Sequence, residues 1–454
     1  MKTLIFLPIE VKQREFYSKL FFSYRALQKN FNCFIGDKIA INRAIKYLGN
    51  GIYFYKSMNF YDTSHIKSVK NKGNIYVVQD EEGAVLTKKE FQKFTKVRGS
   101  NKNLSEIDRF YTWGKFDDNI WKKNYINFRE KFFLTGSPRI DIWKKKIAEK
   151  IFLSEVNYLK KKYHNFTLIV SSGISSKKEL KKKIHIDKIT RSPLKENKNE
   201  LEKRNFWQLK INRDLFEIAQ QLAIQNPKKN FIYRPHPDEN LNDYKYQTKK
   251  KSNFFIDNSL DVLPWLIASD TIIQSCSTVA IQAEILNKPI ISFNPNYLKN
   301  NHRNFPNKFG INIKNKNDLF KIFKKNDLKY KSKKILSKRF YISKRYCSDY
   351  ILKDMKKIIN KKKFKVNLIK FYLLGFIFDI KDRLIKFNIF KKRNQTLYTP
   401  RRSFRTKNPG ISKEEITNFY KKINDKNDIR VMKFLNNGFL ISNVIKKKLR
   451  FNKN

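Results

Sequence analysis

A run of three carboxylates and a glycine follows a short apolar segment, in the order Asp80, Glu81, Glu82 and Gly83. Crowded like charges raise the pKa of any carboxyl group that becomes partly buried, which brings it into the range of a general base. A glycine lets the backbone turn sharply beside a ligand. The same run could simply begin a helix, where acidic side chains are favoured. Taken alone, the run favours this structural interpretation.

A second cluster, Arg234-Pro235-His236-Pro237, follows the apolar segment 231–233. Two prolines restrict the backbone on either side of one histidine. The imidazole could donate to a phosphate or to a leaving group, and Arg234 supplies a second, planar cationic donor. The alternative is a histidine whose ring is hydrogen-bonded within the turn and has a structural role only. The flanking prolines, in a chain with only 5 histidines, favour a functional role.

A third cluster, Ser275, Cys276, Ser277 and Thr278, lies between an apolar segment and a helix expected over 278–286. Ser277 or Thr278 is expected at or near the helix N-cap. Free N–H groups and small hydroxyls at that position suit an anion. An ordinary helix cap explains the same residues, so a phosphate-binding role depends on the other clusters.

Each cluster follows a segment of strand length, which indicates how it is positioned. Short apolar runs separated by helical patterns predict βαβ units and a mainly parallel sheet. Ligands of such sheets bind at the carboxyl ends of the strands. The predicted fold class is therefore α/β, with the clusters at strand ends. The predicted strands are 2–9, 32–38, 51–57, 74–79, 109–112, 131–136, 165–173, 229–233, 269–274 and 288–295; the predicted helices of the first part are 15–29 and 41–48.

Two further groups follow strand-like segments. Residues 135–139 could line a cleft between domains or could be a simple connection. Glu10 could contact an acceptor, although an ion pair with Arg14 or Lys12 explains it equally well. No P-loop, GxGxxG or HExxH motif is present, and no DxD spacing follows a strand in the first half, so metal dependence is not implied.

Length and composition limit the number of domains, the class of protein and the kinds of partner that are expected. A chain of 454 residues exceeds the size of a single hydrophobic core, so two packed domains are expected. An apolar content of 40% excludes a disordered chain. The net charge of +59 will attract polyanions such as nucleic acid, acidic lipid or phosphorylated substrates, although a biased genome explains the lysines equally well. Three dispersed cysteines fit a reducing compartment.

The predicted organisation has three parts. Residues 1–155 form a Rossmann-like acceptor domain, 156–325 a Rossmann-like donor domain, and 326–454 a basic helical tail. Residues 176–204 are expected to form a charged surface excursion. The basic, aromatic-rich segment 367–393 suits an interfacial helix on an anionic membrane or a helix packed on the domains. No segment is long enough to span a bilayer, so a cytoplasmic location is expected.

Taken together and in this order, the clusters resemble those of a family of bacterial surface carbohydrate biosynthesis proteins. The resemblance covers about residues 1–325 and is strongest at 234–237 and 277–280. The family resembles glycosyltransferases of the GT-B type, so the resemblance implies two Rossmann-like domains that face each other across a cleft. The matching segments are 8–20, 35–38, 79–83, 135–141, 231–239 and 275–293.

A more distant similarity is to bacterial sialyltransferases and polysialyltransferases, which use a CMP-activated sugar. Their acid-acid-Gly, His-Pro and Ser/Thr motifs correspond to 81–83, 236–237 and 277–278 here. The resemblance implies that Glu81 deprotonates the acceptor hydroxyl, with Asp80 as the competing base. It implies that His236 meets the donor phosphate or acts as an acid on the leaving group. The implied donor-binding set is Arg234, His236, Ser275, Ser277 and Thr278.

The leading hypothesis is a glycosyltransferase, peripheral on the inner face of the cytoplasmic membrane, that builds a surface polysaccharide or glycolipid. Its expected partners are a nucleotide-sugar donor, a glycan or lipid-linked acceptor and an anionic membrane surface, with no further cofactor. CDP-glycerol-type polymer transferases and non-hydrolysing epimerases share the fold, so the donor stays open and an epimerase is the first alternative. A non-catalytic basic binding protein is the second. No RNP-like strand or basic recognition helix is visible, so no specific nucleic-acid partner is expected.

Overall fold

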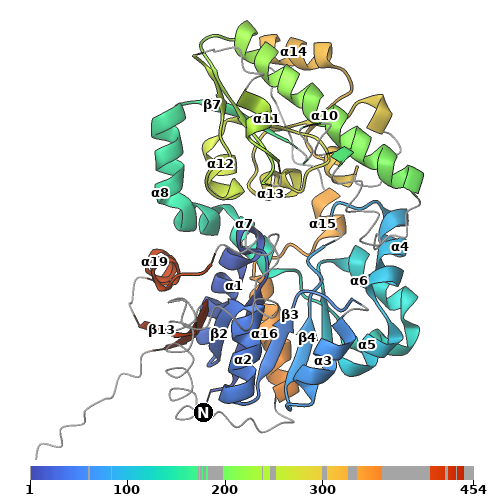
Figure 1. The fold of residues 1–454 in the computed structure, drawn as a ribbon, viewed down its shortest axis with the longest axis vertical. Coiled ribbons are helices and arrows are strands. Elements are labelled where there is room, and N and C mark those ends of the chain that lie inside the picture. The colour runs from blue at the N-terminus through green and yellow to red at the C-terminus, as the bar shows by residue number, and fades with distance from the viewer. Residues whose placement is uncertain are drawn as a thin grey trace, which may run out of the picture.

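The chain forms two lobes, each built on a β-sheet with helices packed against it (Figure 1). The structure is a computed structural model. It describes residues 2–59, 62–82, 84–171, 173, 176, 180–181, 198–237, 239–245, 252–298, 304–325, 335–359, 410–424, 428–435 and 437–443.

The first lobe contains an 8-stranded sheet in the order β13-β14-β2-β1-β3-β4-β5-β6. Strands β1 to β6 pair in parallel. Alternate side chains of β1 enter two different hydrophobic clusters, Ile5 and Leu7 on one face and Leu4 and Phe6 on the other. Burial on both faces explains why the strand is apolar throughout. The strands are β1 (Leu4–Ile9), β2 (Asn32–Asp37), β3 (Ile52–Tyr55), β4 (Ile75–Val78), β5 (Arg109–Thr112) and β6 (Phe132–Leu134).

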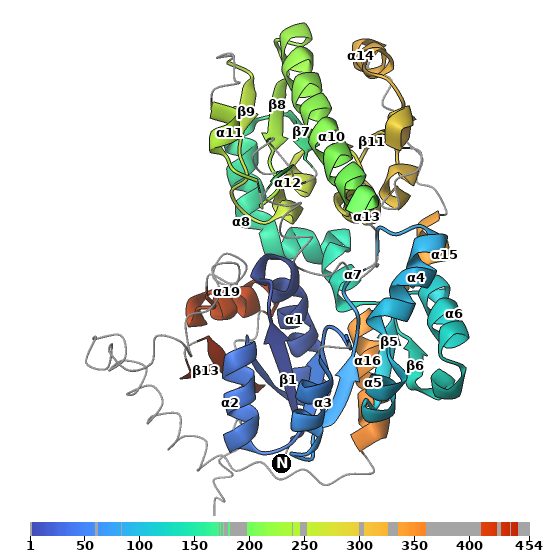
Figure 2. The ribbon, with the colours of Figure 1, turned by 45° about the vertical axis from the view of Figure 1, so that its right-hand side comes forward.

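Helices cover both faces of this sheet (Figure 2). Asp37 caps the helix after β2, because its carboxylate accepts a hydrogen bond from the Ala40 N–H at 2.7 Å. The two predicted helices are present but begin three residues earlier than expected. The helices are α1 (Lys12–Leu27), α2 (Lys38–Leu48), α3 (Thr63–Lys70), α4 (Lys88–Arg98), α5 (Asn101–Glu106), α6 (Lys115–Asn124), η2 (Ile126–Lys131), α7 (Pro138–Trp143) and α8 (Lys145–Tyr163).

The second lobe contains a 6-stranded, fully parallel sheet in the order β12-β11-β10-β7-β8-β9. Its longest helix, α10, begins at Lys198, so the last part of the predicted surface excursion is helical. The strands are β7 (Phe166–Val170), β8 (Asn230–Arg234), β9 (Phe254–Ile256), β10 (Thr271–Gln274), β11 (Ile290–Phe293) and β12 (Ile311–Ile313). The helices are α10 (Lys198–Gln225), α11 (Asn242–Lys245), α12 (Val262–Ala268), α13 (Val279–Ile285), η3 (Asn296–Leu298), η4 (Phe305–Lys308) and α14 (Lys316–Lys325).

The last part of the chain returns to the first lobe, which corrects the expectation of a helical tail. Strand β14 pairs antiparallel with β2, and β13 pairs with β14 at the edge of the sheet. Gly36 permits this close approach, since a Cβ there would lie 2.5 Å from the Asn437 carbonyl oxygen. The apolar residues within 429–435 and 438–443 therefore complete a sheet. The elements are α15 (Ile335–Arg339), α16 (Cys347–Ile359), α19 (Lys413–Ile423), β13 (Ile429–Leu435) and β14 (Gly438–Asn443).

The predicted fold class is confirmed: the chain is an α/β protein with one parallel and one mainly parallel sheet. One hydrophobic cluster extends through both lobes and includes Trp143 and Phe152 together with Trp265 and Ile281. Asp141 of α7 holds the start of α16 by accepting from the backbone N–H of Cys347 and Ser348. The first lobe therefore combines both ends of the chain. The candidate membrane segment 367–393 lies outside the described residues.

Candidate functional site

A cavity of about 310 Å³ lies between the two lobes. The second lobe supplies the loops after β7, β8 and β10 and one face of α10, while the first lobe supplies Gln13 and Val85. The cavity therefore lies at the carboxyl ends of parallel strands, where the sequence predicts the chemistry. Its volume is within the range of small-molecule sites.

The turn after β8 brings Arg234 and His236 to the cavity wall. His236 is exposed, whereas Arg234 is 5% exposed. The Arg234 Nη2 donates to the Leu260 carbonyl oxygen at 3.0 Å, and its Nη1 has no hydrogen-bond partner among the described residues. Burial lowers the pKa of Arg234 to about 10, against the raising effect of Asp261 and Asp257. A buried guanidinium with an unused donor is well suited to an anionic ligand.

Glu239, which sequence reasoning missed as a site residue, fixes this turn. Its carboxylate is 7% exposed, and burial raises its pKa against the lowering effect of its hydrogen bonds. Ser171 donates to it and also accepts from the His236 backbone N–H at 2.8 Å. Glu239 therefore ties the loop after β7 to the turn that carries His236. The donors to Glu239 are Ser171 Oγ at 2.5 Å, Gly173 N at 2.8 Å, Asn212 Nδ2 at 3.1 Å and Tyr244 Oη at 2.5 Å.

The loop after β10 places Ser277 and Thr278 in the cavity wall. Thr278 takes the N-cap position, as expected, but its side chain makes no capping hydrogen bond. Ser277 Oγ instead accepts from the Val279 N–H at 3.3 Å. Ser275 is fully buried, and its hydroxyl contacts the Cys276 Sγ at 3.9 Å rather than lining the cavity.

Asp80 is engaged by an arginine of its own lobe. Arg98 Nε lies 2.9 Å from Asp80 Oδ2, and Arg98 Nη2 lies 3.1 Å from Oδ1. Burial raises the pKa of Asp80 and Arg98 lowers it. Arg98 also pairs with Glu82 at 3.1 Å. Asp80 does not line the cavity, and Gly83 lies outside the described residues.

Glu81 points into the first lobe rather than into the large cavity. Its side chain is 10% exposed and lies 3.7 Å from Arg14 Nε. Burial raises the pKa of Glu81, and nearby Glu15 raises it further against Lys19, Arg139 and Arg14. Glu81 lines a separate cavity of about 20 Å³. Burial therefore raises the pKa of Glu81 as it raises that of Asp80, and both side chains are shielded from solvent.

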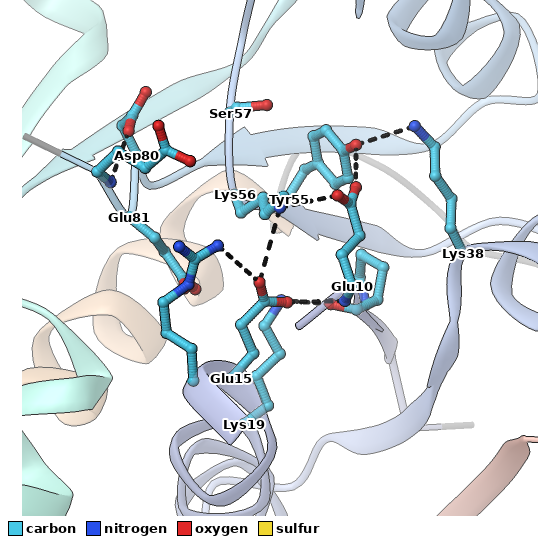
Figure 3. A network of polar contacts seen from close by, with 12 residues as sticks. Glu10, Glu15, Lys19, Lys38, Tyr55, Lys56, Ser57, Asp80 and Glu81 are labelled. Carbon is cyan, nitrogen blue, oxygen red and sulfur yellow. Dashed lines mark hydrogen bonds and ion pairs between the residues drawn. The ribbon is translucent and has the colours of Figure 1, made fainter. Parts of the chain in front are cut away.

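A polar network surrounds the carboxyl ends of β1 and β3 (Figure 3). Glu10 pairs with Lys56 Nζ at 2.7 Å and accepts from the Tyr55 hydroxyl at 2.6 Å. Burial opposes ionisation of Glu10, but Lys56 and Tyr55 outweigh it and lower the pKa to about 2. Glu10 is therefore held as a carboxylate. Its partners differ from those considered from the sequence, since Lys12 pairs with Glu415 and Arg14 with Glu15.

Arg139 lines the small cavity beside Glu81 and also interacts electrostatically with Asp261 of the cavity between the lobes. It is 8% exposed, beside the indoles of Trp113 and Trp143, and its Nη1 donates to the Glu81 carbonyl oxygen at 3.4 Å. Burial lowers the pKa of Arg139 to about 10, and Glu81 and Asp261 are among the groups that raise it. Asp261 lines the large cavity. Arg139 thus joins the acidic cluster to the cavity electrostatically.

The structure brings four of the seven named site residues together in one cavity: Arg234, His236, Ser277 and Thr278. It does not bring Asp80, Glu81 or Ser275 to that cavity. Val85, from the loop that follows the acidic run, does reach it. Among the described residues, no group of three or more His, Cys, Asp and Glu side chains is placed to hold a metal, and no helix is both long enough and apolar enough to cross a bilayer.

The chain is similar to several solved structures that share little sequence with it. A variant of the wall teichoic acid polymerase TagF is 14% identical over 79% of this chain and 89% of that one, with a TM-score of 0.48. The UDP-GlcNAc 2-epimerase of Methanocaldococcus jannaschii is 15% identical over 79% and 100%, with a TM-score of 0.45. No protein-family model and no curated protein matches. Similarity at these identities and TM-scores does not establish an activity for this chain.

Proposed function

We propose that the chain is a glycosyltransferase that moves a sugar from a nucleotide donor to a hydroxyl acceptor. The observation that carries the proposal is the unused Nη1 donor of buried Arg234, which shares a cavity between the lobes with His236, Ser277 and Thr278. A cation, an imidazole and two hydroxyls in one pocket form a set that suits a phosphate. The proposed product is a bacterial surface polysaccharide or glycolipid.

The donor half of the proposed reaction needs charge neutralisation on the departing phosphate. Arg234 supplies a fixed positive charge, since its pKa of about 10 keeps it protonated at neutral pH. His236 stands exposed on a turn whose backbone is held by Ser171, so its imidazole can reach a ligand without disturbing the fold. We assign it to the donor phosphate or to protonation of the leaving group.

The acceptor half needs a base, and we assign Glu81 rather than Asp80. Asp80 is occupied by two hydrogen bonds from Arg98, whereas Glu81 Oε2 has no hydrogen-bond partner among the described residues. Burial raises the pKa of both carboxyl groups, so the pKa does not separate them and the assignment rests on the difference in hydrogen bonding. Glu81 lies outside the cavity that holds His236, so the proposal requires Glu81 to move toward that cavity when substrate binds.

The proposal includes a peripheral position on the inner face of the cytoplasmic membrane. It is supported by the net charge of +59 and by a groove of about 490 Å³ on the first lobe. Cationic side chains near a surface are attracted by anionic lipids. Co-sedimentation with vesicles that contain or lack anionic lipid tests this part. The groove is lined by Lys29, Arg345, Asp349, Tyr350, Lys353 and Lys356.

The experiment that tests the donor assignment is a thermal-shift screen of CMP, CDP, UDP and GDP against the wild type and His236→Ala. Ligand that binds only the folded state raises the melting temperature. We expect one nucleotide to shift the wild type and to shift His236→Ala much less. An equal shift in both proteins would remove His236 from the donor site, and no shift with any nucleotide would contradict the proposed function.

A further inference from the structure

One face of α10 forms a wall of the large cavity. Arg204, Trp207, Gln208 and Ile211 all line the cavity, and their spacing of i, i+3, i+4 and i+7 places them on one side of the helix. The helix is tied to the lobe, because Asp214 accepts from the Tyr297 hydroxyl at 2.6 Å and pairs with Lys316 at 3.0 Å. This face is therefore a fixed part of the pocket.

Two amide oxygens in the cavity wall have no hydrogen-bond partner among the described residues. They are Oε1 of Gln208 on α10 and Oε1 of Gln282 on α13. Gln282 is 6% exposed, so water reaches it poorly. A buried polar atom without a partner is unfavourable unless a ligand satisfies it. The wall thus presents unused acceptors as well as the unused donor of Arg234, which fits a ligand with an anionic end and an N–H or O–H bearing end.

Trp207 adds a flat aromatic surface to the same wall. Part of its side chain packs against the hydrophobic cluster of the second lobe, and the residue also lines the cavity. An aromatic ring offers a stacking partner to any nucleobase, since every base has a π face. Its neighbour in sequence, Gln208, can hydrogen-bond the edge of a base stacked there.

We propose that Trp207 and Gln208 form a nucleobase subsite in this cavity, with the phosphate at Arg234 and His236. The inference rests on the proposed function and deepens it. The base stacks on the Trp207 indole, and the Gln208 amide hydrogen-bonds the base edge. The ligand class is then a nucleoside mono- or diphosphate, and Gln208 contributes to the choice among bases.

The experiment follows tryptophan fluorescence while the full chain is titrated with CMP, UMP, AMP and GMP. The chain has 5 tryptophans, and the four besides Trp207 are at most 4% exposed, so a ligand in the cavity quenches Trp207 in particular. We expect quenching by the preferred nucleotide and its loss in Trp207→Phe, while calorimetry still detects binding. Gln208→Leu should change the ranking of the four nucleotides.

Affinity measured by calorimetry separates base stacking from general packing. Trp207→Leu should lower the affinity for the preferred nucleotide by about tenfold to a hundredfold and leave the affinity for ribose 5-phosphate unchanged. The matched control is Phe206→Leu, because Phe206 is 56% exposed and does not line the cavity. It should bind both ligands like the wild type.

Three results would overturn the subsite. Wild-type affinity for the nucleotide in Trp207→Leu would remove the stacking role. A parallel loss of nucleotide and ribose 5-phosphate binding would assign Trp207 to packing alone. If the wild type binds no nucleotide, both this inference and the proposed function are wrong. Nucleotide binding that is lost in Arg234→Met and kept in Trp207→Leu would preserve the proposed function and reject only the subsite.

Discussion

Ser171 connects Glu239 to His236: its hydroxyl donates to the Glu239 carboxylate and accepts from the His236 backbone N–H at 2.8 Å. A carboxylate with no direct contact to the cavity thus holds the turn that carries the histidine. Four hydrogen bonds converge on this one buried group. The backbone at His236 is therefore held in place before any ligand binds, which reduces the entropy cost of binding there.

Glu239→Gln should loosen this turn. One carboxylate oxygen is replaced by an NH2 group, which cannot accept a hydrogen bond, so the free energy of unfolding should fall by about 2 kcal/mol. Donor affinity should fall in the same variant because the His236 turn is no longer fixed. Urea unfolding and calorimetry measure the two effects. The control Glu217→Gln removes a half-exposed partner of Lys316 and should cost under about 1 kcal/mol. Donor affinity that is unchanged in Glu239→Gln would show that the turn does not depend on this carboxylate.

Asp80 and Glu81 should respond differently to neutralisation. Asp80→Asn leaves the buried Arg98 guanidinium poorly paired, so the free energy of unfolding should fall by about 3 kcal/mol or more. Glu81→Gln removes a charge that burial already disfavours, so stability should change by less than about 1 kcal/mol while sugar transfer is abolished. Turnover in folded Glu81→Gln at the wild-type rate would remove the base assignment.

The pH dependence of transfer should report the environment of Glu81. Burial, and then Glu15, raise the pKa of Glu81. Because the base works in its deprotonated form, activity should be lost on acidification at a higher pH than an ordinary glutamate would give. Glu15→Gln removes a neighbouring negative charge, so the acidic limb of the profile of kcat/KM should move to lower pH. A limb that stays in place in this variant would contradict the role of Glu81.

Incubation with donor alone separates a transferase from an epimerase. A transferase should leave the nucleotide sugar almost unchanged until an acceptor is added, because no acceptor hydroxyl is present to which the sugar could be transferred. Formation of an epimeric nucleotide sugar at a steady rate, measured by chromatography of the donor, would favour the epimerase instead.

The sequence is sufficient for most of the two sheets, because each central strand is an apolar run bounded by helical patterns. It does not predict the three-residue edge strands β9 and β12 of the second sheet, and it is insufficient for β13 and β14 of the first. The reason for β13 and β14 is the sequence separation from their partner. Their apolar residues are visible in the sequence, but their partner β2 lies near the other end of the chain, so local pattern cannot show the pairing. The predicted start of α1 lies three residues too late, because the first turn of the helix is polar and lacks the apolar period.

The donor half of the candidate site was predictable because its residues are consecutive in sequence and follow strands. Arg234 and His236 share one turn, and Ser277 and Thr278 share another. The orientation of the side chains in the acidic run, 80–82, is not predictable from the sequence. The direction of each carboxylate depends on Arg98 and Arg14, which reach it from α4 and α1. Glu239 ends the matching segment 231–239 but no role is expected of it, and Trp207 belongs to no motif; only the fold places them beside the cavity.

Titration of the preferred nucleotide into the wild type and Arg234→Met most directly tests whether the cavity between the lobes binds an activated sugar through its phosphate. Arg234 offers the one feature, a buried cation with an unused donor, on which the donor site depends. We predict that Arg234→Met binds at least about tenfold more weakly, as expected for loss of a charge-assisted hydrogen bond. Equal affinity in the two proteins would contradict the account.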